Sequence, residues 1–331
     1  MKMNSVWYPV LESPRLTGPT PFVFFDQQLV LFRTEDGQPH AMQRSCPHRG
    51  FDLARGKVAG DFLVCPYHGW SFGAYGAGHS PGTPRLHCTA KSVAAAESHG
   101  FIWLRESGDQ PLEESDAFKL LGVDGAKFCG AVLADFAGPI EVVIDNFNEI
   151  EHTGEVHGSF GYPTERMHEV EITWERLAQG KFFISSMGPQ KPLGWWQRQF
   201  LKLSNNDYFY GTWTTTVAPS TSSYTNRWFT TKTKEVQRSF GLDLRIFYLP
   251  LTKQSTRLVA FVYTTNMVLF PILRLIFMHL IKREISYDQT IVAHLLDSTQ
   301  ALSGRRLGRF DAVLQELRKD QLAAAGAKVT S

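Results

Sequence analysis

The chain has 331 residues, of which 43% are hydrophobic and 20% are charged, which are the proportions of a folded globular protein and not of a disordered one. The formal net charge is only +2, so the composition gives no electrostatic basis for binding nucleic acid. The length is sufficient for two domains of ordinary size.

The N-terminal third of the chain is predicted to be an antiparallel β domain. Between Phe22 and Trp103 the sequence consists of short β-type runs (FVFF, LVLF, DFLV and FIWL) separated by turns rich in Gly, Pro and Asp. The polar stretch RESGDQPLEESDAF at 105–118 follows and is typical of a linker. We therefore predict one domain over residues 1–120 and a second over residues 121–331.

The second domain is predicted to be α+β. It begins with PIEVVIDNFNEIEHTGEV, a helical pattern with apolar residues on one face. Six β-type runs follow and predict an antiparallel sheet of five or six strands: EITWERL, KFFISSM, DYFYGTWTTTV, NRWFTTKTKEV, LDLRIFYL and RLVAFVYTT. Two or three helices are expected between Met267 and Ala325, wrapped against the sheet.

The most apolar segment of the chain is MVLFPILRLIFMHLI at 267–281. It is shorter than the roughly 20 residues needed to span a bilayer, and Pro271 and Arg274 interrupt it. We expect a buried or channel-lining helix and no transmembrane span; a helix lying on a membrane surface is the alternative.

Two of the four cysteines and two of the eleven histidines fall in one short stretch, CPHRGFDLARGKVAGDFLVCPYHGW, as Cys46, His48, Cys65 and His68. Thiolates together with imidazoles are suited to zinc or to an iron–sulfur cluster. Structural zinc sites usually contain a Cys-x(2–4)-Cys pair, whereas here each pair mixes Cys with His. In a Rieske centre one iron has two thiolate ligands and the other has two imidazole ligands. The mixed pairs therefore favour a Rieske cluster over zinc, and Gly50 and Gly69 allow the loops to close over it.

This stretch resembles the Rieske [2Fe–2S] motif of ring-hydroxylating and related oxygenases, in which Cys-Pro-His-Arg-Gly and Cys-Pro-Tyr-His-Gly-Trp are both typical. The sequence GFIWL at 100–104 also resembles the closing strand of that domain. The resemblance implies that Cys46 and Cys65 bind one iron and that His48 and His68 bind the other. A Rieske cluster transfers single electrons and performs no substrate chemistry, so the second domain must have another role.

A second candidate site lies in EVVIDNFNEIEHTGEVH, where His152 and His157 are five residues apart and Glu149 precedes His152 by one turn. If the helix unwinds slightly after Thr153-Gly154, both imidazoles can reach one metal. A solvated polar helix face is the alternative. Non-haem Fe(II) oxygenases use two histidines and one carboxylate and leave the other positions of the iron open, so a mononuclear iron is the favoured interpretation.

The resemblance to Rieske oxygenases extends to this segment, because their catalytic domain contains an acidic-x-x-His-x(4)-His pattern that Glu149, His152 and His157 match. The family's acidic residue is more often Asp than Glu. Its implied role is to link a Rieske histidine of a neighbouring subunit to an iron-ligating histidine. Asp145, one turn earlier, is expected to be either a more distant support of this site or a solvated acid.

The third iron ligand is expected to be a distant carboxylate in EISYDQTIVAHLLDSTQ. Its candidates Asp288 and Asp297 are nine residues apart and so lie on opposite faces of a helix. In the family the ligand lies near the start of the last long helical region, after an acidic or aromatic residue, and Tyr287-Asp288 matches that position. The resemblance therefore implies Asp288, and His294 is expected to pack or to support the site.

By this resemblance the protein is a terminal oxygenase (alpha) component of the ring-hydroxylating oxygenase family, with a helix-grip (START-like) catalytic domain. The resemblance implies a homotrimer and an NAD(P)H-dependent reductase, possibly with a ferredoxin. No Gly-x-Gly-x-x-Gly follows a strand in this sequence, so the reductant is expected to come from a partner. The implied reaction is hydroxylation or oxidative demethylation of a hydrophobic or aromatic small molecule with O₂. Chains of this length resemble single-subunit oxygenases, which favours monooxygenation over dihydroxylation.

Two other functions remain alternatives: a Rieske electron carrier, and a ligand-binding helix-grip protein without oxygenase chemistry. Cys88 and Cys129 match no ligand position and are expected to be buried free thiols. With four cysteines and no apolar signal segment, the chain is predicted to reside in a reducing cytoplasm.

Overall fold

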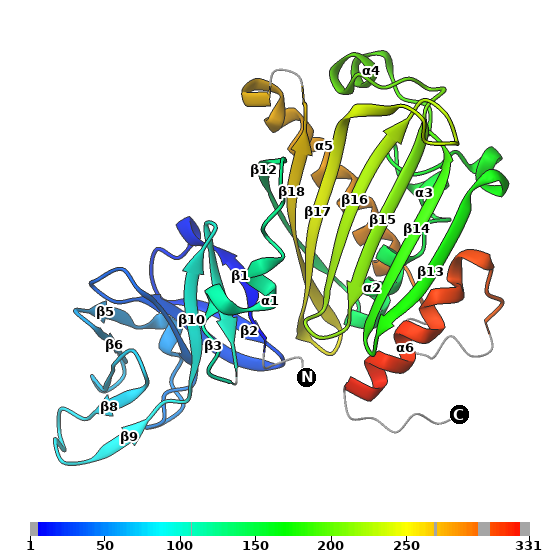
Figure 1. Ribbon diagram of the computed structural model, residues 1–331. Coiled ribbons are helices and arrows are strands. Elements are labelled where there is room, and N and C mark those ends of the chain that lie inside the picture. The colour runs from blue at the N-terminus through cyan, green and yellow to red at the C-terminus, as the bar shows by residue number, and fades with distance from the viewer. Residues whose placement is uncertain (1–5, 107, 268–269, 297–304, 325–331) are drawn as a thin grey trace. The chain divides into compact units, whose positions relative to one another are not determined.

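The computed structural model describes residues 6–106, 108–267, 270–296 and 305–324 (Figure 1). The chain divides into two compact units. The N-terminal unit comprises Asn4–Phe118 and Leu249–Lys253, and the C-terminal unit is formed mainly by Lys119–Tyr248 and the residues from Gln254 onward.

The N-terminal unit contains two antiparallel sheets. The six-stranded sheet has the order β1-β11-β10-β4-β3-β2, with the strands β1 Tyr8–Glu12, β2 Thr20–Phe24, β3 Gln27–Arg33, β4 Pro39–Gln43, β10 Ser92–Ser98 and β11 Phe101–Arg105. The five-stranded sheet runs in chain order through β5 Lys57–Ala59, β6 Phe62–Val64, β7 Ser71–Phe72, β8 Ala77–His79 and β9 His87–Thr89. The short helical turns in this part of the chain are η2 Ser13–Arg15, η3 Leu53–Arg55, η4 Leu112–Glu114 and α1 Asp116–Lys119.

Strand β3 shows why this unit forms, because its LVLF run is apolar on both faces. Leu29 and Leu31 pack into one hydrophobic core, whereas Val30 and Phe32 pack into a second core that also contains Cys46 and Cys65. Successive side chains of a strand point to opposite faces, so a continuous apolar run is expected where both faces are covered. The strand therefore links the framework of the unit to the two cysteine loops.

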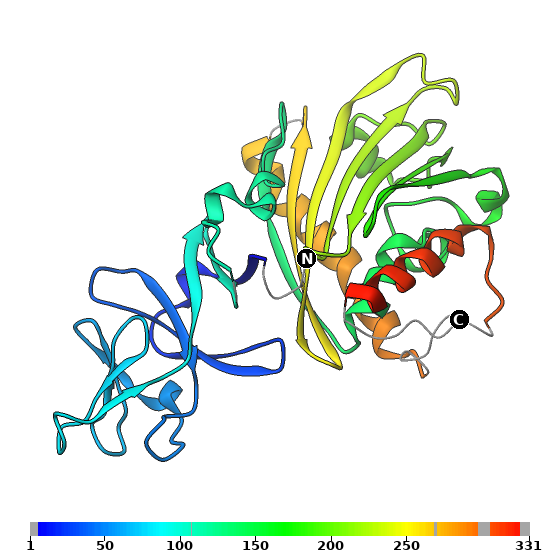
Figure 2. The same ribbon diagram turned by 60° about the horizontal axis from the view of Figure 1, so that its bottom comes forward.

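The C-terminal unit is a seven-stranded antiparallel sheet of order β12-β18-β17-β16-β15-β14-β13 with helices packed on one face (Figures 1 and 2). The strands are β12 Lys127–Phe136, β13 Glu171–Ala178, β14 Lys181–Pro189, β15 Tyr208–Thr216, β16 Thr221–Phe229, β17 Gln237–Thr252 and β18 Ser255–Thr265. The helices are α2 Ile140–Asn148, α3 Thr153–Val156, η5 Thr164–Glu169, α4 Trp195–Leu201, α5 Phe270–Ala293, η6 Arg309–Asp311 and α6 Ala312–Ala324.

Two hydrophobic clusters hold the helices of this unit to the sheet. Helices α2 and α5 pack on β12, β16, β17 and β18 through side chains such as Val143, Phe277 and Ile281. Helix α6 packs on β14 and β15, where Leu317 contacts the cluster that contains Phe182. The α+β class and the antiparallel sheets predicted from the sequence are therefore confirmed.

The sheet has seven strands and not five or six, because β12 was not predicted. Its sequence KFCGAVLADF contains Gly130 and two charged residues, yet it pairs with the buried strand β18 along its whole length. Strand β16 also begins earlier than predicted, at Thr221, and ends at Phe229. The residues TTKTKEV that follow it form a turn in which Lys234 has a positive φ of 60°.

The helix predicted over residues 141–157 is broken, and the break lies before His152 instead of after Thr153-Gly154. Helix α2 ends at Asn148, and Glu149 is extended, with φ −104° and ψ 131°. The Glu149 carboxylate then accepts hydrogen bonds from the backbone N–H groups of Glu151 and His152. Such bonds compete with helical ones, so the acid itself stabilises the break.

The apolar segment 267–281 was predicted to be a buried or channel-lining helix, and only one face of α5 is buried, with Ile281 in the lining of a cavity. Phe277 and Ile281 are buried, whereas Ile272, Leu275 and Ile276 are 67%, 68% and 63% exposed. No helix among the described residues has both the length and the hydropathy needed to cross a bilayer.

Candidate functional site

Two loops, 46–51 and 65–70, bring the paired cysteines and histidines together in the N-terminal unit. In each loop the cysteine N–H donates to the carbonyl five residues later, Phe51 in the first loop and Trp70 in the second. In each loop the glycine N–H also donates back to the cysteine carbonyl. Gly50 and Gly69 have φ values of 71° and 72°, which L side chains rarely adopt. The sequence thus builds the same turn twice.

The side chains of these loops form a donor set of two sulfurs and two imidazoles. Cys46 and Cys65 are 3% and 2% exposed, and burial, together with the neighbouring thiol, raises the pKa of Cys46. The His48 and His68 rings lie 4.7 Å apart at the exposed side, and His48 stacks on Trp70 at 4.6 Å. Inner thiols and outer imidazoles are the arrangement that a Rieske cluster requires.

The two remaining cysteines are free thiols. Cys129 is buried, and its Sγ lies 3.2 Å from the Thr264 Oγ1. Cys88 is only half-buried, which corrects the expectation for it. Burial raises the pKa of both thiols, so neither is activated as a nucleophile.

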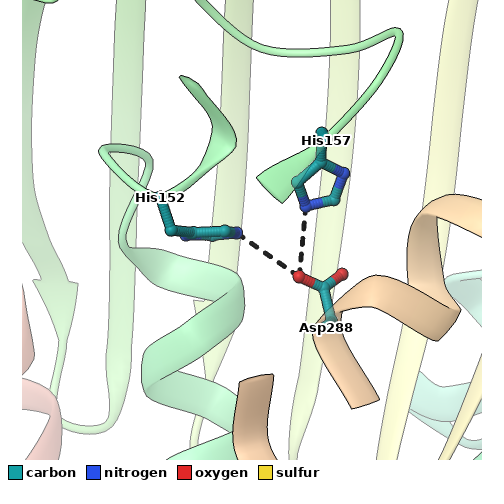
Figure 3. A group of neighbouring side chains, drawn as sticks. All are labelled: His152, His157 and Asp288. Carbon is teal, nitrogen blue, oxygen red and sulfur yellow. Dashed lines mark hydrogen bonds and ion pairs between the residues drawn. The ribbon is translucent and has the colours of Figure 1, made fainter. Parts of the chain in front are cut away.

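The C-terminal unit brings His152, His157 and Asp288 together (Figure 3). His152 lies just before α3, His157 just after it, and Asp288 is on α5. The Nε2 atoms of His152 and His157 are 3.4 and 3.1 Å from the same Asp288 oxygen, Oδ1. One ligand atom from each residue lies within 4.8 Å of the others, a spacing that a single metal ion can bridge. Two imidazoles and one carboxylate form the facial triad of non-haem Fe(II) oxygenases.

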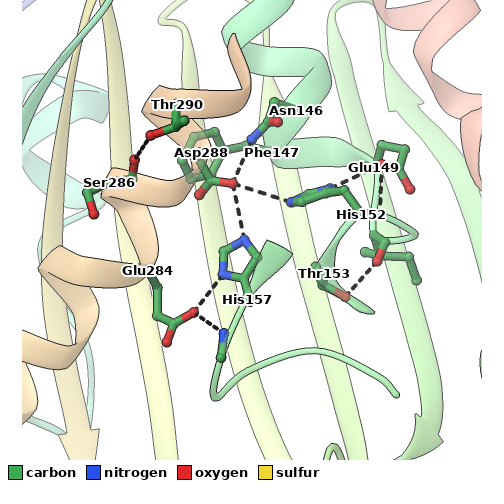
Figure 4. Close-up of polar contacts among 12 residues, drawn as sticks. Asn146, Phe147, Glu149, His152, Thr153, His157, Glu284, Ser286, Asp288 and Thr290 are labelled. Atoms are coloured by element: carbon green, nitrogen blue, oxygen red, sulfur yellow. Dashed lines mark hydrogen bonds and ion pairs between the residues drawn. The ribbon is translucent and has the colours of Figure 1, made fainter. Parts of the chain in front are cut away.

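Each imidazole has its own carboxylate on the other side of the ring (Figure 4). The His152 Nδ1 is 3.1 Å from the Glu149 Oε2, and the His157 Nδ1 is 3.2 Å from the Glu284 Oε2. These contacts fix the tautomer that leaves both Nε2 atoms as metal ligands. Glu284 was not singled out in the sequence; its signal was its position one helical turn before Asp288.

The charges of the triad reinforce each other. Burial alone would lower the pKa of His152, but hydrogen bonds with Asp288 and Glu149 outweigh it and raise that pKa to about 9. The pKa of His157 is raised in the same way by Asp288 and Glu284, against burial. Burial would raise the pKa of Asp288, but the two histidines lower it to about 2. The site therefore stabilises an ionised Asp288 beside positive charge, and a bound metal ion can supply that positive charge in place of the protonated histidines.

The backbone of the histidine loop is held by residues from the sheet. Asn148, the last residue of α2, accepts hydrogen bonds from Trp213 at 2.9 Å and from Thr215 at 2.6 Å. Lys191, two residues after β14, donates from its Nζ to the carbonyl oxygens of Thr153, Gly154 and His157 at 3.0, 2.5 and 2.5 Å. Neither support was predicted, because both are distant in sequence from the loop.

Several other candidates lie elsewhere. Asp145 is neither solvated nor in contact with the histidines: it is buried, and Arg318 of α6 donates to it at 2.8 Å. Burial, opposed by Arg318, raises the Asp145 pKa to about 6. His294 neither packs in the core nor supports the site; it is exposed and contacts the Thr290 carbonyl. Asp297 lies outside the described residues.

The triad lies in the wall of a cavity of about 160 Å³ between the sheet and helices α2, α3 and α5. The other walls are largely apolar, with Phe147, Phe209, Trp213, Leu242, Leu244, Ile246 and Ile285 among the lining residues. Cavities of about 150 Å³ with apolar walls hold molecules of the size of benzene. An open metal position would therefore face a space that fits an organic ring.

Comparison with known proteins assigns the N-terminal unit: residues 6–93 match the family model of the Rieske [2Fe-2S] domain. The chloroplastic chlorophyllide a oxygenase of Chlamydomonas reinhardtii is 35% identical over 163 residues, which are 47% of this chain and 25% of that protein. The vanillate O-demethylase oxygenase subunit of Pseudomonas sp. (strain HR199 / DSM 7063) is 30% identical over 161 residues, 47% of this chain and 45% of that protein. These matches thus span less than half the length of either relative.

The whole chain also resembles solved structures. The crystal structure of dicamba monooxygenase bound to 3,6-dichlorosalicylic acid matches with a TM-score of 0.80 and 17% sequence identity, over 98% of both chains. At this identity the match establishes a shared fold across both units.

Proposed function

We infer that the chain belongs to the Rieske oxygenase family, and from that premise we propose that it is the terminal oxygenase of a Rieske non-haem iron system. The observation that carries this proposal is the convergence of His152, His157 and Asp288 in the wall of an apolar cavity. A Rieske electron carrier would need neither the triad nor the cavity, and a ligand-binding protein would not need the triad.

The donor sets support two cofactors. Cys46, Cys65, His48 and His68 would hold a [2Fe–2S] cluster, since buried thiols and outward imidazoles fit its two unlike irons. His152, His157 and Asp288 would hold a mononuclear Fe(II). When bound, the cluster supplies single electrons and the mononuclear iron supplies the open positions at which O₂ is activated.

The residues around the triad prepare it for this chemistry. Glu149 and Glu284 hold the Nδ1 protons of His152 and His157, which aims both Nε2 atoms inward. Asn146 donates to Asp288 Oδ1 at 3.0 Å and fixes the carboxylate on α5. The aromatic and aliphatic walls exclude water and orient a hydrophobic substrate beside the triad.

We propose monooxygenation, with oxidative demethylation as its variant for substrates that bear an O-methyl or N-methyl group. One oxygen atom of O₂ enters a C–H bond of the substrate, and the other leaves as water with two electrons and two protons. A hydroxylated methyl group would then leave as formaldehyde. The names of two similar proteins, a vanillate O-demethylase subunit and a dicamba monooxygenase, support this class of reaction.

The electrons must come from a partner, and we propose an NAD(P)H-dependent reductase, with or without a ferredoxin. We also propose a head-to-tail homotrimer, in which Glu149 connects His152 with His68 of the partner subunit. The Glu149 side chain is 17% exposed, against 3% for Asp288, and could accept such a contact. The four free cysteines support a reducing compartment such as the cytoplasm.

Oxygen uptake by the purified protein with a surrogate reductase tests the proposal, in a screen of ring-sized hydrophobic compounds. The expected result is ¹⁸O from ¹⁸O₂ in a hydroxylated product, or formaldehyde and the demethylated compound from a methylated substrate. Asp288→Asn should abolish product and lower the iron content from about three to about two per chain, with the Rieske spectrum unchanged. Two irons per chain in the active-site-intact protein, with neither ¹⁸O in a hydroxylated product nor formaldehyde from a methylated compound, would instead identify an electron carrier.

A further inference from the structure

The sheet wall of the cavity contains a row of residues that is partly polar. Ser186 of β14, Gly211 of β15, Asn226 of β16 and Leu242 of β17 lie directly opposite one another in register. All four line the cavity. Gly211 has no side chain between Ser186 and Asn226, and a Cβ there would lie in tight contact, 3.3 Å from the Asn226 Oδ1 and 3.4 Å from the Ser186 Oγ. We call Ser186, Gly211 and Asn226 the polar notch.

The hydrogen bonds of the cavity single out Asn226. Every other polar side chain in the lining has a protein partner, for example Tyr162, which donates to the Ser186 Oγ at 2.7 Å. In the described part of the chain the Asn226 side-chain amide has no such partner, although the residue is only 8% exposed. An amide without a protein partner is free to bond a ligand in the cavity, and a ligand that pairs with it gains affinity and orientation.

The charges of the lining restrict that ligand. The cavity wall includes the carboxylates of Glu149, Glu284 and Asp288, and no Lys or Arg is among its lining residues. The nearby cation Lys191 is committed to three backbone carbonyls. Apart from the histidines of the triad and the metal they would hold, an anionic group would find no cationic partner in the lining, whereas a neutral group meets an N–H donor and a C=O acceptor on Asn226.

Building on the proposed function, we propose that the polar notch binds one uncharged hydrogen-bonding group, such as a carbonyl or hydroxyl, of a ring-sized hydrophobic substrate. The rest of the substrate then lies along the apolar wall between the notch and the triad. Asn226 is thereby the residue that determines which end of the substrate is held and which is presented to the triad.

Anaerobic calorimetry on the holoprotein tests the notch without turnover, using three probes with nine non-hydrogen atoms each: acetophenone, isopropylbenzene and benzoate. Asn226→Leu should weaken acetophenone binding about three- to tenfold and leave isopropylbenzene binding unchanged or tighter. Gly211→Ala, which narrows the notch, should also weaken acetophenone binding. Thr225→Val, on the opposite face of β16, is the matched control and should change the binding of neither acetophenone nor isopropylbenzene.

The proposal is overturned if Asn226→Leu affects acetophenone and isopropylbenzene alike, if benzoate suffers the greater loss, or if none of the probes binds. Iron content and the Rieske spectrum are recorded for every variant. Binding that responds as expected while no compound is oxygenated would refute the proposed function but keep the notch.

A second observation, independent of the reaction, concerns the exposed side of α4 and of the first half of α5. The two helices lie side by side, since the Phe200 and Phe277 rings are 6.2 Å apart. Five large apolar side chains of these helices are exposed by 58–78%: Trp195, Trp196, Ile272, Leu275 and Ile276. We call this set the apolar face.

The charged residues of α4, of the first half of α5 and of their flanking loops are mostly basic. The segments 192–206 and 270–283 contain Arg198, Lys202, Arg274, Lys282 and Arg283 but no Asp or Glu. Exposed tryptophans beside basic residues are typical of helices that lie in the interface of an anionic bilayer. We propose that the apolar face docks on a lipid surface that contains anionic lipid.

Cosedimentation of the full chain with vesicles tests this docking. Vesicles of phosphatidylcholine with about 30% phosphatidylglycerol should bind the protein, and salt or pure phosphatidylcholine should weaken binding. The variant Trp195→Ser/Trp196→Ser/Ile276→Ser should lose at least tenfold in binding, whereas Tyr75→Ser, which removes an aromatic that is 83% exposed in the other unit, should lose none. Absent binding, or a changed oligomeric state of the triple variant, would overturn the proposal, the latter because it identifies a contact between subunits.

Discussion

At the scale of single residues, the triad depends on how its imidazoles are held as much as on the ligands themselves. Glu149 contacts His152, and Glu284 contacts His157, each through Nδ1. The two acids differ in their surroundings, since Glu284 is 4% exposed and also accepts from the Gly158 N–H at 2.9 Å. Glu284 is thus positioned to fix His157, and Glu149 to connect His152 with the protein surface.

Glu284→Gln should weaken binding of the mononuclear metal about tenfold, because the amide donates less charge to the His157 ring. Competition with a chelator, followed by iron analysis, measures this, and the Rieske spectrum serves as an internal reference. Glu155→Gln, an exposed acid in the same loop, is the matched control. Equal metal retention in the two variants would contradict a positioning role for Glu284.

The pKa values of the triad predict a pH dependence of the metal-free protein. The pKa of His152 is raised to about 9 and that of His157 is raised as well, so protonated imidazoles stabilise the folded state fully below about pH 6.5. This contribution is lost as the pH rises toward 9. We expect the melting temperature of chelator-treated protein to fall over this interval, while metal affinity rises because the imidazoles must lose protons. A melting temperature independent of pH would contradict this.

Much of this site could be predicted from the sequence, since the ligand residues occur in short motifs. The cluster loops repeat a Cys-Pro start and a glycine, and His152 and His157 follow an acid at a fixed interval. Asn226 could not be found in this way, and the only signal of Glu284 was its place one helical turn before Asp288, because both roles depend on strands and helices meeting in space. An Asn in a β run has no local signal that distinguishes a cavity wall from the surface.

At the scale of elements, the break between α2 and α3 determines the site. A continuous helix over 141–157 would place His152 and His157 five residues apart, about 140° around its axis. The break removes this constraint, and Lys191 fixes the new path by binding three carbonyl oxygens of the loop.

Lys191→Met should leave those three carbonyls without their donor and lower the free energy of unfolding by about 2 kcal/mol. It should also weaken binding of the mononuclear metal, since the carbonyl of His157 itself is released. Lys191→Arg should recover part of both losses, because a cationic donor is retained. Denaturant unfolding and iron analysis measure the two effects; unchanged metal retention in Lys191→Met would show that the loop holds its shape without Lys191.

The elements that sequence analysis missed share a physical cause. Strand β12 has a weak local pattern, and its place in the sheet comes from pairing with β18, so tertiary contacts override propensity. The helix break likewise depends on Glu149, whose side chain replaces helical hydrogen bonds with its own. Long runs with strong periodicity, such as β14, β15 and β18, were predicted within a few residues.

At the scale of the whole molecule, the proposed trimer predicts complementation between defective subunits. Cys46→Ser chains lack the cluster, and Asp288→Asn chains lack the mononuclear iron. If electrons pass between subunits, mixed oligomers of the two should regain part of the parent turnover, because some interfaces combine an intact cluster with an intact triad. Sedimentation checks that each variant still assembles. No recovery in verified mixed trimers would confine electron transfer to a single chain.

The long-range pairing of the sheet has a consequence for how the protein is made. The cluster loops lie within 25 residues of each other in the sequence. By contrast, His157 contacts Asp288 across 131 residues, and Lys127 of β12 pairs with Thr264 of β18. At roughly 5–20 residues per second, ribosomal synthesis leaves His157 without its carboxylate partner for on the order of ten seconds. Bringing together residues so far apart in the sequence is also slow, because the chain loses conformational entropy before the long-range contacts form. A nascent chain can therefore offer sulfur ligands long before it can offer the complete facial triad, and the full site for mononuclear iron exists only after the ribosome has released Asp288.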